Sequence, residues 1–237
     1  MTEQGRYFYV DSIKGDDSCS GFTPEEAWRS LEKVNELIFQ PGDHIRFRRG
    51  GEWHGMLRFQ GNGSAWSPIA VEAYGEGGMP QIHGDGCYAA VLLEGVSHWR
   101  VKELAVTNEA ETRSVRQGIC ICGSPQGITE DIVIEGCEIS RVAGENRRAR
   151  DVYQSMYWNS GIYVTMPGRS SDKNHLHDII ISSNYVHDVL TSGIRVNQQE
   201  DFINDIHHTH VVVRGNRIER TGSDGIIVAN CISPLID

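Results

Sequence analysis

Two stretches of thirteen residues decide the fold: NYVHDVLTSGIRV at 184–196 and NRIERTGSDGIIV at 216–228. They begin thirty-two residues apart, and both run from an Asn through a branched apolar residue and a polar turn to Gly-Ile-x-Val. Sequence periods of roughly 20–50 residues are typical of repeat proteins, in which each unit buries its apolar face only against its neighbours. The two stretches therefore predict successive units of one repeat.

The repeat extends towards the N-terminus. Strands of the form Gly-Ile-x-(Ile/Val) open at Gly118, Gly161, Gly193 and Gly225, and in each of them apolar residues alternate with others. Such alternation is typical of a strand with one buried face. A second strand follows in three of these units, at IVIEGCEI, IIISSNYV and VVVRGNRI, and the AVLLEG segment resembles an earlier, diverged unit.

Constant strands joined by loops of variable length predict a parallel β-solenoid, because stacked coils bury the apolar face that a single unit cannot. A propeller would need about four strands per repeat, and a leucine-rich repeat would need a Leu/Asn consensus that the sequence lacks. A βαβ sheet would need helical crossovers, and no helical pattern follows residue 40. We therefore predict an all-β fold with coils over 61–237, which are expected to continue beyond Asp237 because ANCISPLID stops part-way through a unit.

Residues 1–60 are predicted to form an N-terminal cap made of a strand, a helix and the first strands of the solenoid. Thr23, Pro24 and Glu26 have the pattern of a helix N-cap, a first helical position and a capping box. Apolar residues follow at helical spacing, so an α-helix is expected over 24–39. A solenoid end exposes unpaired backbone and apolar interior, and we expect this helix to cover it.

The charge, the cysteine pattern and the N-terminal residues indicate which classes of partner and which cellular location to expect. The net charge is -10, and nucleic acids and anionic membranes reward a basic surface, so neither is an expected partner. The six Cys show no CxxC pair and are expected to be free thiols. The opening MTEQGRYFYV has no basic and apolar leader, so the chain is expected to be cytoplasmic if Met1 is its true start and secreted otherwise. The sequence leaves the oligomeric state open.

One aligned position of the repeat reads Leu104, Cys137, Asn184 and Asn216. Asn tolerates the left-handed backbone of a sharp bend, and stacked Asn amides can form hydrogen bonds from coil to coil. We therefore interpret the two Asn residues as structural.

A longer segment carries a family resemblance. FYVDSIKGDDSCSGFTPEEAWRSLEKVN, followed by PGDHIRFRRGGEWHG, resembles the start of right-handed parallel β-helix proteins of the pectate-lyase-like superfamily. The later Gly-Ile-x-Val units are similar to the repeats of these proteins, so the likeness covers nearly the whole chain. It implies an N-terminal portion of a β-helix protein that acts on a polysaccharide or oligosaccharide lying along the coils. It implies no single activity, because the superfamily contains hydrolases, lyases, epimerases and non-catalytic binding proteins.

Parallel coils lie about 4.8 Å apart, so equivalent side chains of adjacent coils are neighbours. The outward side chains of the Gly-Ile-x-Val strands are predicted to stack as Cys120–Tyr163–Arg195–Ile227, with Glu94 preceding Cys122 and Asn197 in the parallel column. Tyr163, Arg195 and Asn197 would offer a sugar an aromatic platform, a guanidinium and an amide. Arg195 is also a candidate catalytic residue, and Glu94 is a further candidate substrate-binding residue. The alternative, a solvated sheet face, has equal weight.

Carboxylates at the turns are candidate catalytic groups. Asp224 stands where the preceding units have only Ser, beside the Tyr163/Arg195 face, and it could act as acid, base or nucleophile. An ordinary Asp-Gly turn explains it as well. Its partner acid would have to be Glu94, Asp188 or a residue beyond Asp237.

His187 and Asp188 form a second candidate catalytic pair at the end of a strand. The aligned residues of the next coil are Glu219 and Arg220, so ion pairs between coils are an alternative explanation of both residues.

Histidines gather in two adjacent coils: His175 and His177 in one, and His207, His208 and His210 in the next. Stacked imidazoles could bind a metal, but solvated loop histidines are favoured, and no metal ligand is predicted. No cofactor is predicted either. Calcium is conceivable, but no acidic cluster in the sequence supports it.

The longest insertion, AGENRRARDVYQSMYW at 143–158, concentrates Arg and aromatic residues in an acidic protein. Arg147, Tyr157 and Trp158 are its candidate substrate-binding residues, because an Arg/aromatic loop suits a glycan, especially one that bears carboxylates. The loop could instead cover the apolar stripe of Val133, Ile180 and Val212.

Together these observations favour a carbohydrate-active enzyme that cleaves glycosidic bonds, with hydrolysis ahead of other chemistry. Lyases of this fold commonly use a Lys or Arg base with calcium, and Lys is scarce in this chain. A polysaccharide lyase or epimerase stays open as an alternative, as does a non-catalytic glycan-binding solenoid.

Overall fold

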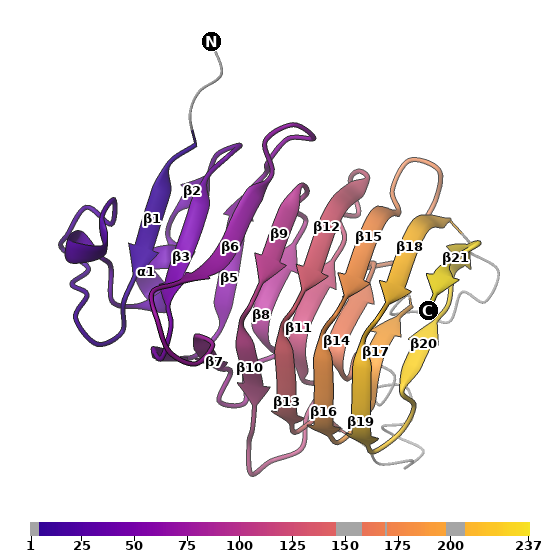
Figure 1. The fold of residues 1–237 in the computed structure, drawn as a ribbon. Helices are drawn as coiled ribbons and strands as arrows, with labels where there is room; N and C mark the ends of the chain where they lie inside the picture. The colour runs from indigo at the N-terminus through magenta and orange to yellow at the C-terminus, as the bar shows by residue number, and fades with distance from the viewer. Residues whose placement is uncertain (1–4, 146–157, 169, 198–206) are drawn as a thin grey trace.

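The computed structural model describes residues 5–145, 158–168, 170–197 and 207–237, and its strands wind into a parallel β-helix (Figure 1). From β3 to β20, each coil contributes one strand to each of three sheets before the chain starts the next coil. The described strands pair in parallel with their equivalents in the neighbouring coils. The predicted solenoid and its parallel pairing are therefore confirmed.

The three sheets are called I, II and III in the order in which a coil visits them. Sheet I contains β1 (Tyr7–Val10), β3 (His44–Arg48), β6 (Ile69–Tyr74), β9 (Trp99–Lys102), β12 (Thr129–Glu135), β15 (Leu176–Ser182), β18 (His208–Arg214), β21 (Cys231–Ile232) and β22 (Leu235–Ile236). Sheet II contains β4 (Glu52–His54), β7 (Gln81–His83), β10 (Ala105–Asn108), β13 (Glu138–Val142), β16 (Tyr185–Val189) and β19 (Arg217–Thr221). Sheet III contains β2 (Ile38–Phe39), β5 (Leu57–Gly61), β8 (Ala89–Glu94), β11 (Gln117–Cys122), β14 (Ser160–Thr165), β17 (Ser192–Val196) and β20 (Ile226–Val228).

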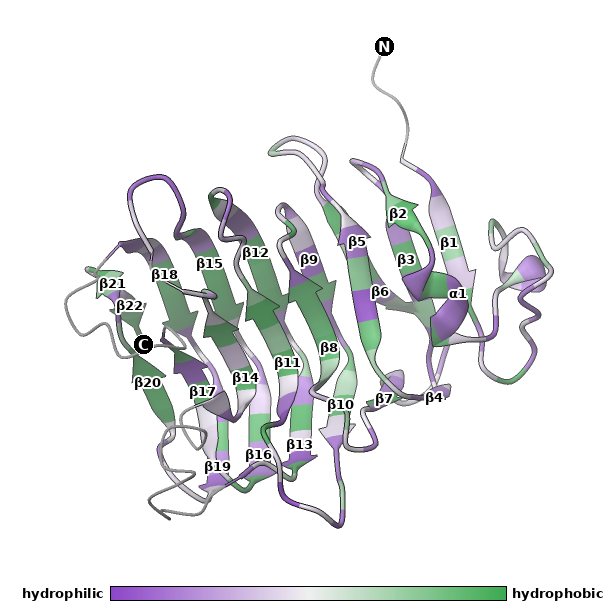
Figure 2. Ribbon diagram, turned by 180° about the vertical axis from the view of Figure 1, so that it is seen from behind, coloured by the Kyte–Doolittle hydropathy of each residue, from purple (hydrophilic) through white to green (hydrophobic). Residues whose placement is uncertain are grey.

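The interior of the coils is one continuous apolar core that runs along the helix axis. Ile162 of β14 pairs with Ile119 on one side and with Ile194 on the other, and all three side chains are buried. Ile226 continues the column in β20. Figure 2 shows hydrophobic residues recurring across neighbouring strands of this core, as in β12 and β15. Among the described residues, no helix is long and apolar enough to cross a membrane.

Close packing between sheets II and III requires a glycine at three of the four Gly-Ile-x-Val strands. A Cβ atom on Gly161 would lie 2.5 Å from Val186 Cγ1 and 2.8 Å from the carbonyl oxygen of Gly193. Gly118 and Gly193 meet equivalent obstacles in Ile139 and Ile218. The motif therefore repeats at Gly118, Gly161 and Gly193 because these corners have no room for a side chain, whereas at Gly225 the nearest atom, Ile218 Cγ2, lies 4.0 Å away.

The predicted Asn ladder is present at the bend between sheets I and II. Asn184 Oδ1 accepts the backbone N–H of Cys137 at 2.9 Å, and Asn216 Oδ1 accepts that of Asn184 at 3.0 Å. The bend itself differs from the prediction. The left-handed residue is the one before the Asn column, for example Ser183 with φ 56°, so the Asn side chains tie coils together and are not themselves the bend.

The N-terminal helix is much shorter than the predicted 24–39. Thr23 caps only a 3₁₀ turn, Pro24–Glu26, and the α-helix α1 is confined to Leu31–Asn35 with Ser30 as its N-cap. Between the two, the backbone of Trp28 is extended. Its backbone N–H donates to Tyr9 O at 2.9 Å, and the backbone N–H of Asp11 donates to Trp28 O at 2.7 Å. Pairing with β1 buries the indole beside Phe8, and this tertiary contact overrides the local helical pattern. A long capping helix is therefore not confirmed.

Three strands of sheet I share an irregularity that the alternation pattern did not predict. Asp131, Asp178 and His210 have left-handed φ values of 55°, 51° and 52°. In β12, β15 and β18, two consecutive side chains consequently lie on the outer surface before alternation resumes. Such bulges change the direction in which side chains point, and they recur here in register.

Candidate functional site

The predicted outward column of sheet III has the expected register but is not an open surface. Cys120 pairs with Tyr163, Tyr163 with Arg195, and Arg195 with Ile227. However, Tyr163 is 0% exposed and Arg195 only 3% exposed. Tyr163 belongs to a second apolar cluster that also contains Ala89, Leu92, Cys120 and Cys122, with Met56 and Trp158 packed against it. Tyr163 and Arg195 therefore do not form the predicted sugar-binding face in this structure.

Burial sets the chemistry of this outer cluster. Desolvation raises the pKa of the Cys122 thiol to about 11, and the nearby Glu94 charge contributes in the same direction. The pKa of the Tyr163 phenol is also raised, again mainly by burial. Both groups are neutral at pH 7, so the cluster acts as packing.

Arg195 connects this buried cluster to the surface. Its guanidinium Nη2 donates to Ser192 Oγ at 2.9 Å and lies 3.6 Å from Asp224 Oδ2. Asp224 is about half exposed and also accepts the hydroxyl of Ser223 at 2.8 Å. The structure thus brings together Arg195 and Asp224, with the carboxylate facing solvent.

Glu94 cannot be the partner acid of Asp224. It aligns with Cys122 as predicted, but β8 is four coils from β20, a separation of about 19 Å at about 4.8 Å per coil. Glycosidase carboxyl pairs lie at most about 9.5 Å apart. Glu94 instead forms an ion pair with Arg58 at 2.9 Å.

Charges alternate along the turn between sheets II and III. Arg141 Nε lies 2.9 Å from Glu109 Oε1, and Arg220 holds Asp188 with two hydrogen bonds of 2.6 and 2.8 Å. Arg141, Asp188 and Arg220 occupy the same place in successive coils, each with a left-handed φ of 49–52°. The predicted alignment of Asp188 with Arg220 is confirmed, and the two residues form the expected ion pair between coils.

His187 connects Asp188 to the surface of sheet II. Its ring lies 2.6 Å from Asp188 Oδ2 and 3.2 Å from Glu138 Oε1, and it stacks on Tyr185 with centroids 4.2 Å apart. Hydrogen bonds from Arg220 and then from His187 hold the pKa of the Asp188 carboxyl well below its ordinary value. Asp188 therefore stays ionised and cannot serve as a general acid near neutral pH.

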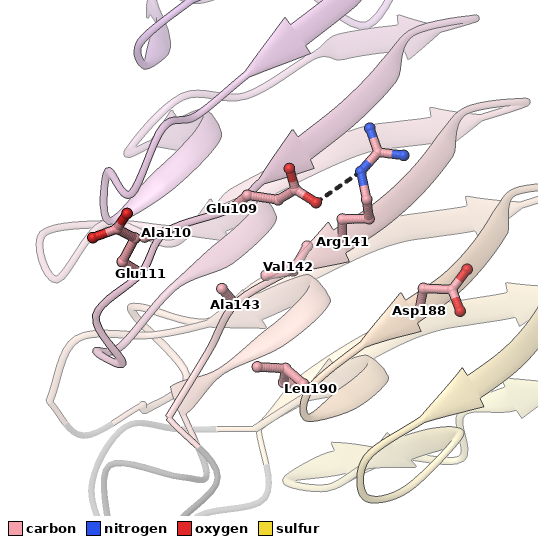
Figure 3. Close-up of a pocket in the computed structure, with 8 residues that line it drawn as sticks. All are labelled: Glu109, Ala110, Glu111, Arg141, Val142, Ala143, Asp188 and Leu190. Carbon is pink, nitrogen blue, oxygen red and sulfur yellow. Dashed lines mark ion pairs between the residues drawn. The ribbon is translucent and has the colours of Figure 1, made fainter.

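A hollow opens beside these charges (Figure 3). Its volume is about 530 Å³, within the range of ligand sites. Side chains of three coils line it: Glu109, Ala110, Glu111, Arg141, Val142, Ala143, Asp188 and Leu190. The close-up shows Val142, Ala143 and Leu190 between Glu111 and Asp188, beside the ion pair of Glu109 and Arg141.

The hollow lies one coil from Asp224. Gly222 N donates to Val189 O at 2.9 Å, and Ser223 N donates to Thr191 O at 3.2 Å. These bonds place residues 222 and 223 beside Val189 and Thr191, so Asp224 follows the turn of the next coil and is not itself among the residues that line the hollow. Sequence reasoning identified Asp188 and Asp224 but missed Glu109 and Arg141. The only signal for Arg141 was its alignment with Asp188 and Arg220.

The insertion at 143–158 is described only in part. Arg147 and Tyr157 lie outside the described residues, and so does most of the predicted substrate-binding loop. Trp158 is half-buried against the outer cluster, and its carbonyl oxygen accepts a hydrogen bond from Gln117 Nε2. Asn197, at the end of β17, is also partly buried and donates its backbone N–H to Val164 O at 3.0 Å.

Comparisons with known proteins agree with this architecture. No family model matches the chain. Over an alignment 322 positions long, gaps included, the chain is 25% identical to a lacto-N-biosidase of Bifidobacterium longum subsp. longum, and the match covers 100% of this chain and 20% of that protein. The crystal structure of GH136 lacto-N-biosidase from Eubacterium ramulus superposes with a TM-score of 0.68 at 20% identity, covering 98% of this chain and 56% of that one. The matched structures also include the pectate lyase Pel9A, at a TM-score of 0.48 and 12% identity.

These relatives are longer than the chain. It spans about half the length of the solved lacto-N-biosidase and a fifth of the curated one. The superposition shows the fold: the chain has the parallel β-helix architecture of these carbohydrate-active proteins, as the resemblance of its N-terminal segment implied.

Proposed function

We propose that this chain is part of a glycoside hydrolase that acts on oligosaccharides, and that the turn hollow binds the sugar. The observation that carries the proposal is the similarity, over the whole length of this chain, to a lacto-N-biosidase. The name of that relative suggests the substrate class, a glycan that contains lacto-N-biose. The hollow supplies what such a ligand needs from a protein surface.

Sugars present hydroxyl groups at their edges and C–H groups on their faces. Glu109 and Asp188 can accept hydrogen bonds from hydroxyls, and Arg141 can donate them. Leu190, 42% exposed, gives the C–H face an apolar contact. The volume of about 530 Å³ suits a small oligosaccharide.

The proposed roles of the acids follow from their surroundings. Asp188 stays ionised beside Arg220, so it can stabilise positive charge that develops at the sugar ring. Asp224, exposed one coil further on, is the candidate for the second carboxylate. Arg195 and His187 position these two acids and are not proposed to touch the sugar.

The test uses the full chain with a p-nitrophenyl glycoside of lacto-N-biose, measuring release of nitrophenol and binding by calorimetry. Turnover supports the hydrolase. Binding without turnover favours the non-catalytic solenoid, and an unsaturated or epimerised product from an acidic polysaccharide favours a lyase or epimerase. If the chain shows neither binding nor turnover, the proposal is overturned.

Two variants locate the site. Ala143→Trp fills the hollow and should weaken binding by about tenfold or more, which is about 1.4 kcal/mol. Ile128→Trp, at a 45% exposed position outside the hollow, should leave binding unchanged. Asp224→Asn should reduce turnover while the thermal midpoint stays close to that of the parent. A well-folded Asp224→Asn protein with full turnover would remove Asp224 from the mechanism.

A further inference from the structure

Three potential metal ligands meet on the outer surface of sheet I, on a different sheet from the hollow. His177 and Asp178 come from β15, and His210 comes from β18 in the next coil. Their ligand atoms all lie within 4.8 Å of one another. His177 Nε2 is 3.3 Å from Asp178 Oδ2, and His210 Nδ1 is 2.7 Å from Asp178 Oδ1.

The backbone brings this set together. Asp178 and His210 are directly adjacent across the coils and both have left-handed φ values, 51° and 52°. The left-handed residue breaks the alternation of β15, so His177 and Asp178 both lie on the outer surface although they are consecutive. A regular strand would have pointed one of them into the core.

The hydroxyl of Thr209 orients the imidazole of His177. His177 Nδ1 lies 2.7 Å from Thr209 Oγ1, and the rings of His177 and His210 stack with centroids 5.1 Å apart. When Nδ1–H is donated to the threonine, the Nε2 lone pair faces the Asp178 carboxylate. A cation between these two acceptors resolves their repulsion, and a hydrogen-bonded second nitrogen is the usual state of a metal-binding histidine.

We propose that His177, Asp178 and His210 form a binding site for a divalent transition metal of the Zn²⁺ class. Two imidazoles and one carboxylate are ligands that zinc accepts, and water can complete a tetrahedron. Bonds of about 2.0–2.2 Å place tetrahedral ligand atoms about 3.3–3.5 Å apart, close to the 3.3 Å between His177 and Asp178. The side chains are 33%, 45% and 75% exposed, so an ion can reach them from solvent.

The neighbouring charges favour a cation at this position. Glu130 aligns with His177 in the preceding coil, and Asp131 aligns with Asp178. Arg100 donates a hydrogen bond of 2.6 Å to Asp131, and His98 lies 3.6 Å from Glu130, so Asp178 supplies the negative charge at the site itself. The bound ion would connect β15 to β18 and should therefore raise the thermal midpoint by mass action.

The experiment titrates Zn²⁺ into the tag-free, chelator-treated full chain by calorimetry and follows the thermal midpoint. His210→Asn and Asp178→Asn each remove one ligand, and Asn tolerates the left-handed backbone at both positions. Each should lower zinc affinity by at least about tenfold, since even outer-shell changes cost metal sites about 10–100-fold. Each should also abolish the zinc-dependent rise of the midpoint.

The matched control is His54→Asn. His54 is likewise an exposed histidine, 2.8 Å from Asp85 and stacked on His83 with centroids 5.0 Å apart. Its loss should leave zinc binding unchanged. The proposal is overturned if the parent chain binds no zinc, if both site variants bind it as the parent does, or if the control loses as much affinity as they do. None of these outcomes bears on the glycan site, which lies between sheets II and III.

Discussion

At the scale of single residues, burial decides which polar groups can take part in chemistry. Tyr163 and Arg195 carry the side chains of a sugar-binding surface, yet both are buried within the structure. Asp224 and Asp188 are chemically similar to each other, but Asp188 is fixed by two hydrogen bonds from Arg220, whereas Asp224 has one longer contact with Arg195. The partner, more than the residue type, separates a carboxylate held firmly by a guanidinium from one that is held loosely.

His208 should make the stability of the protein depend on pH. Its side chain is buried and its Nδ1 accepts the backbone N–H of Leu176 at 3.2 Å. Burial, with smaller effects from His175 and His207, lowers its pKa from 6.5 to about 4. Because the pKa of His208 is lower in the folded protein than in the unfolded chain, the free energy of unfolding is at its full value above pH 6.5. It decreases as the pH falls towards 4, by on the order of 3 kcal/mol over that window.

Chemical denaturation between pH 7 and pH 5 measures this effect before most carboxylates titrate. The free energy of unfolding should decrease as the pH is lowered, both in the parent chain and in the exposed-site control His54→Asn. His208→Asn should be less stable at pH 7 but should show a flatter profile. Parallel profiles for all three proteins would contradict the assignment.

At the scale of elements, two backbone features recur from coil to coil: left-handed residues at bends and bulges, and glycines at tightly packed corners. The Gly-Ile-x-Val glycines sit where sheet II presses against sheet III, and the bulged residues of sheet I sit where two successive side chains point outward. The glycines allow the sheets to pack closely, and the bulges place two consecutive side chains on the outer surface.

Gly161→Ala should destabilise the protein, and Gly225→Ala should not. The new methyl group at residue 161 would lie 2.5 Å from Val186 Cγ1, and overpacking of this kind costs about 1–3 kcal/mol. At residue 225 the nearest atom, Ile218 Cγ2, is 4.0 Å away, so alanine should be neutral or slightly stabilising. Urea denaturation of both variants compares them, and equal midpoints would show that the corner is not tightly packed.

At the scale of the whole molecule, one apolar core connects all the coils. Buried side chains run without interruption from Phe8 to Val213, and each coil packs mainly on its two neighbours. A solenoid of this kind derives its stability from the interfaces between coils. A fault in one interior column is therefore felt by the coils on both sides.

Ile194→Asp tests the interior column directly. The new carboxylate would lie between Ile162 and Ile226 without a partner, which costs several kcal/mol. The thermal midpoint should fall steeply, or the protein should fail to fold. Ile128→Asp, at a 45% exposed position, should change it little. An unchanged midpoint in Ile194→Asp would contradict the register of the coils.

The sequence by itself determined the coils, their register and the Asn ladder. Residue alternation records which side of a strand faces the core, and a fixed repeat records which residues become neighbours. Only the tertiary structure decided the rest. Trp28 is extended because β1 offers it a hydrogen-bonded partner, which no local pattern reveals. Tyr163 is buried because facing outward from a strand does not mean facing solvent. The hollow and the His177/Asp178/His210 cluster depend on left-handed residues that break alternation, so their side chains meet only after the chain has folded.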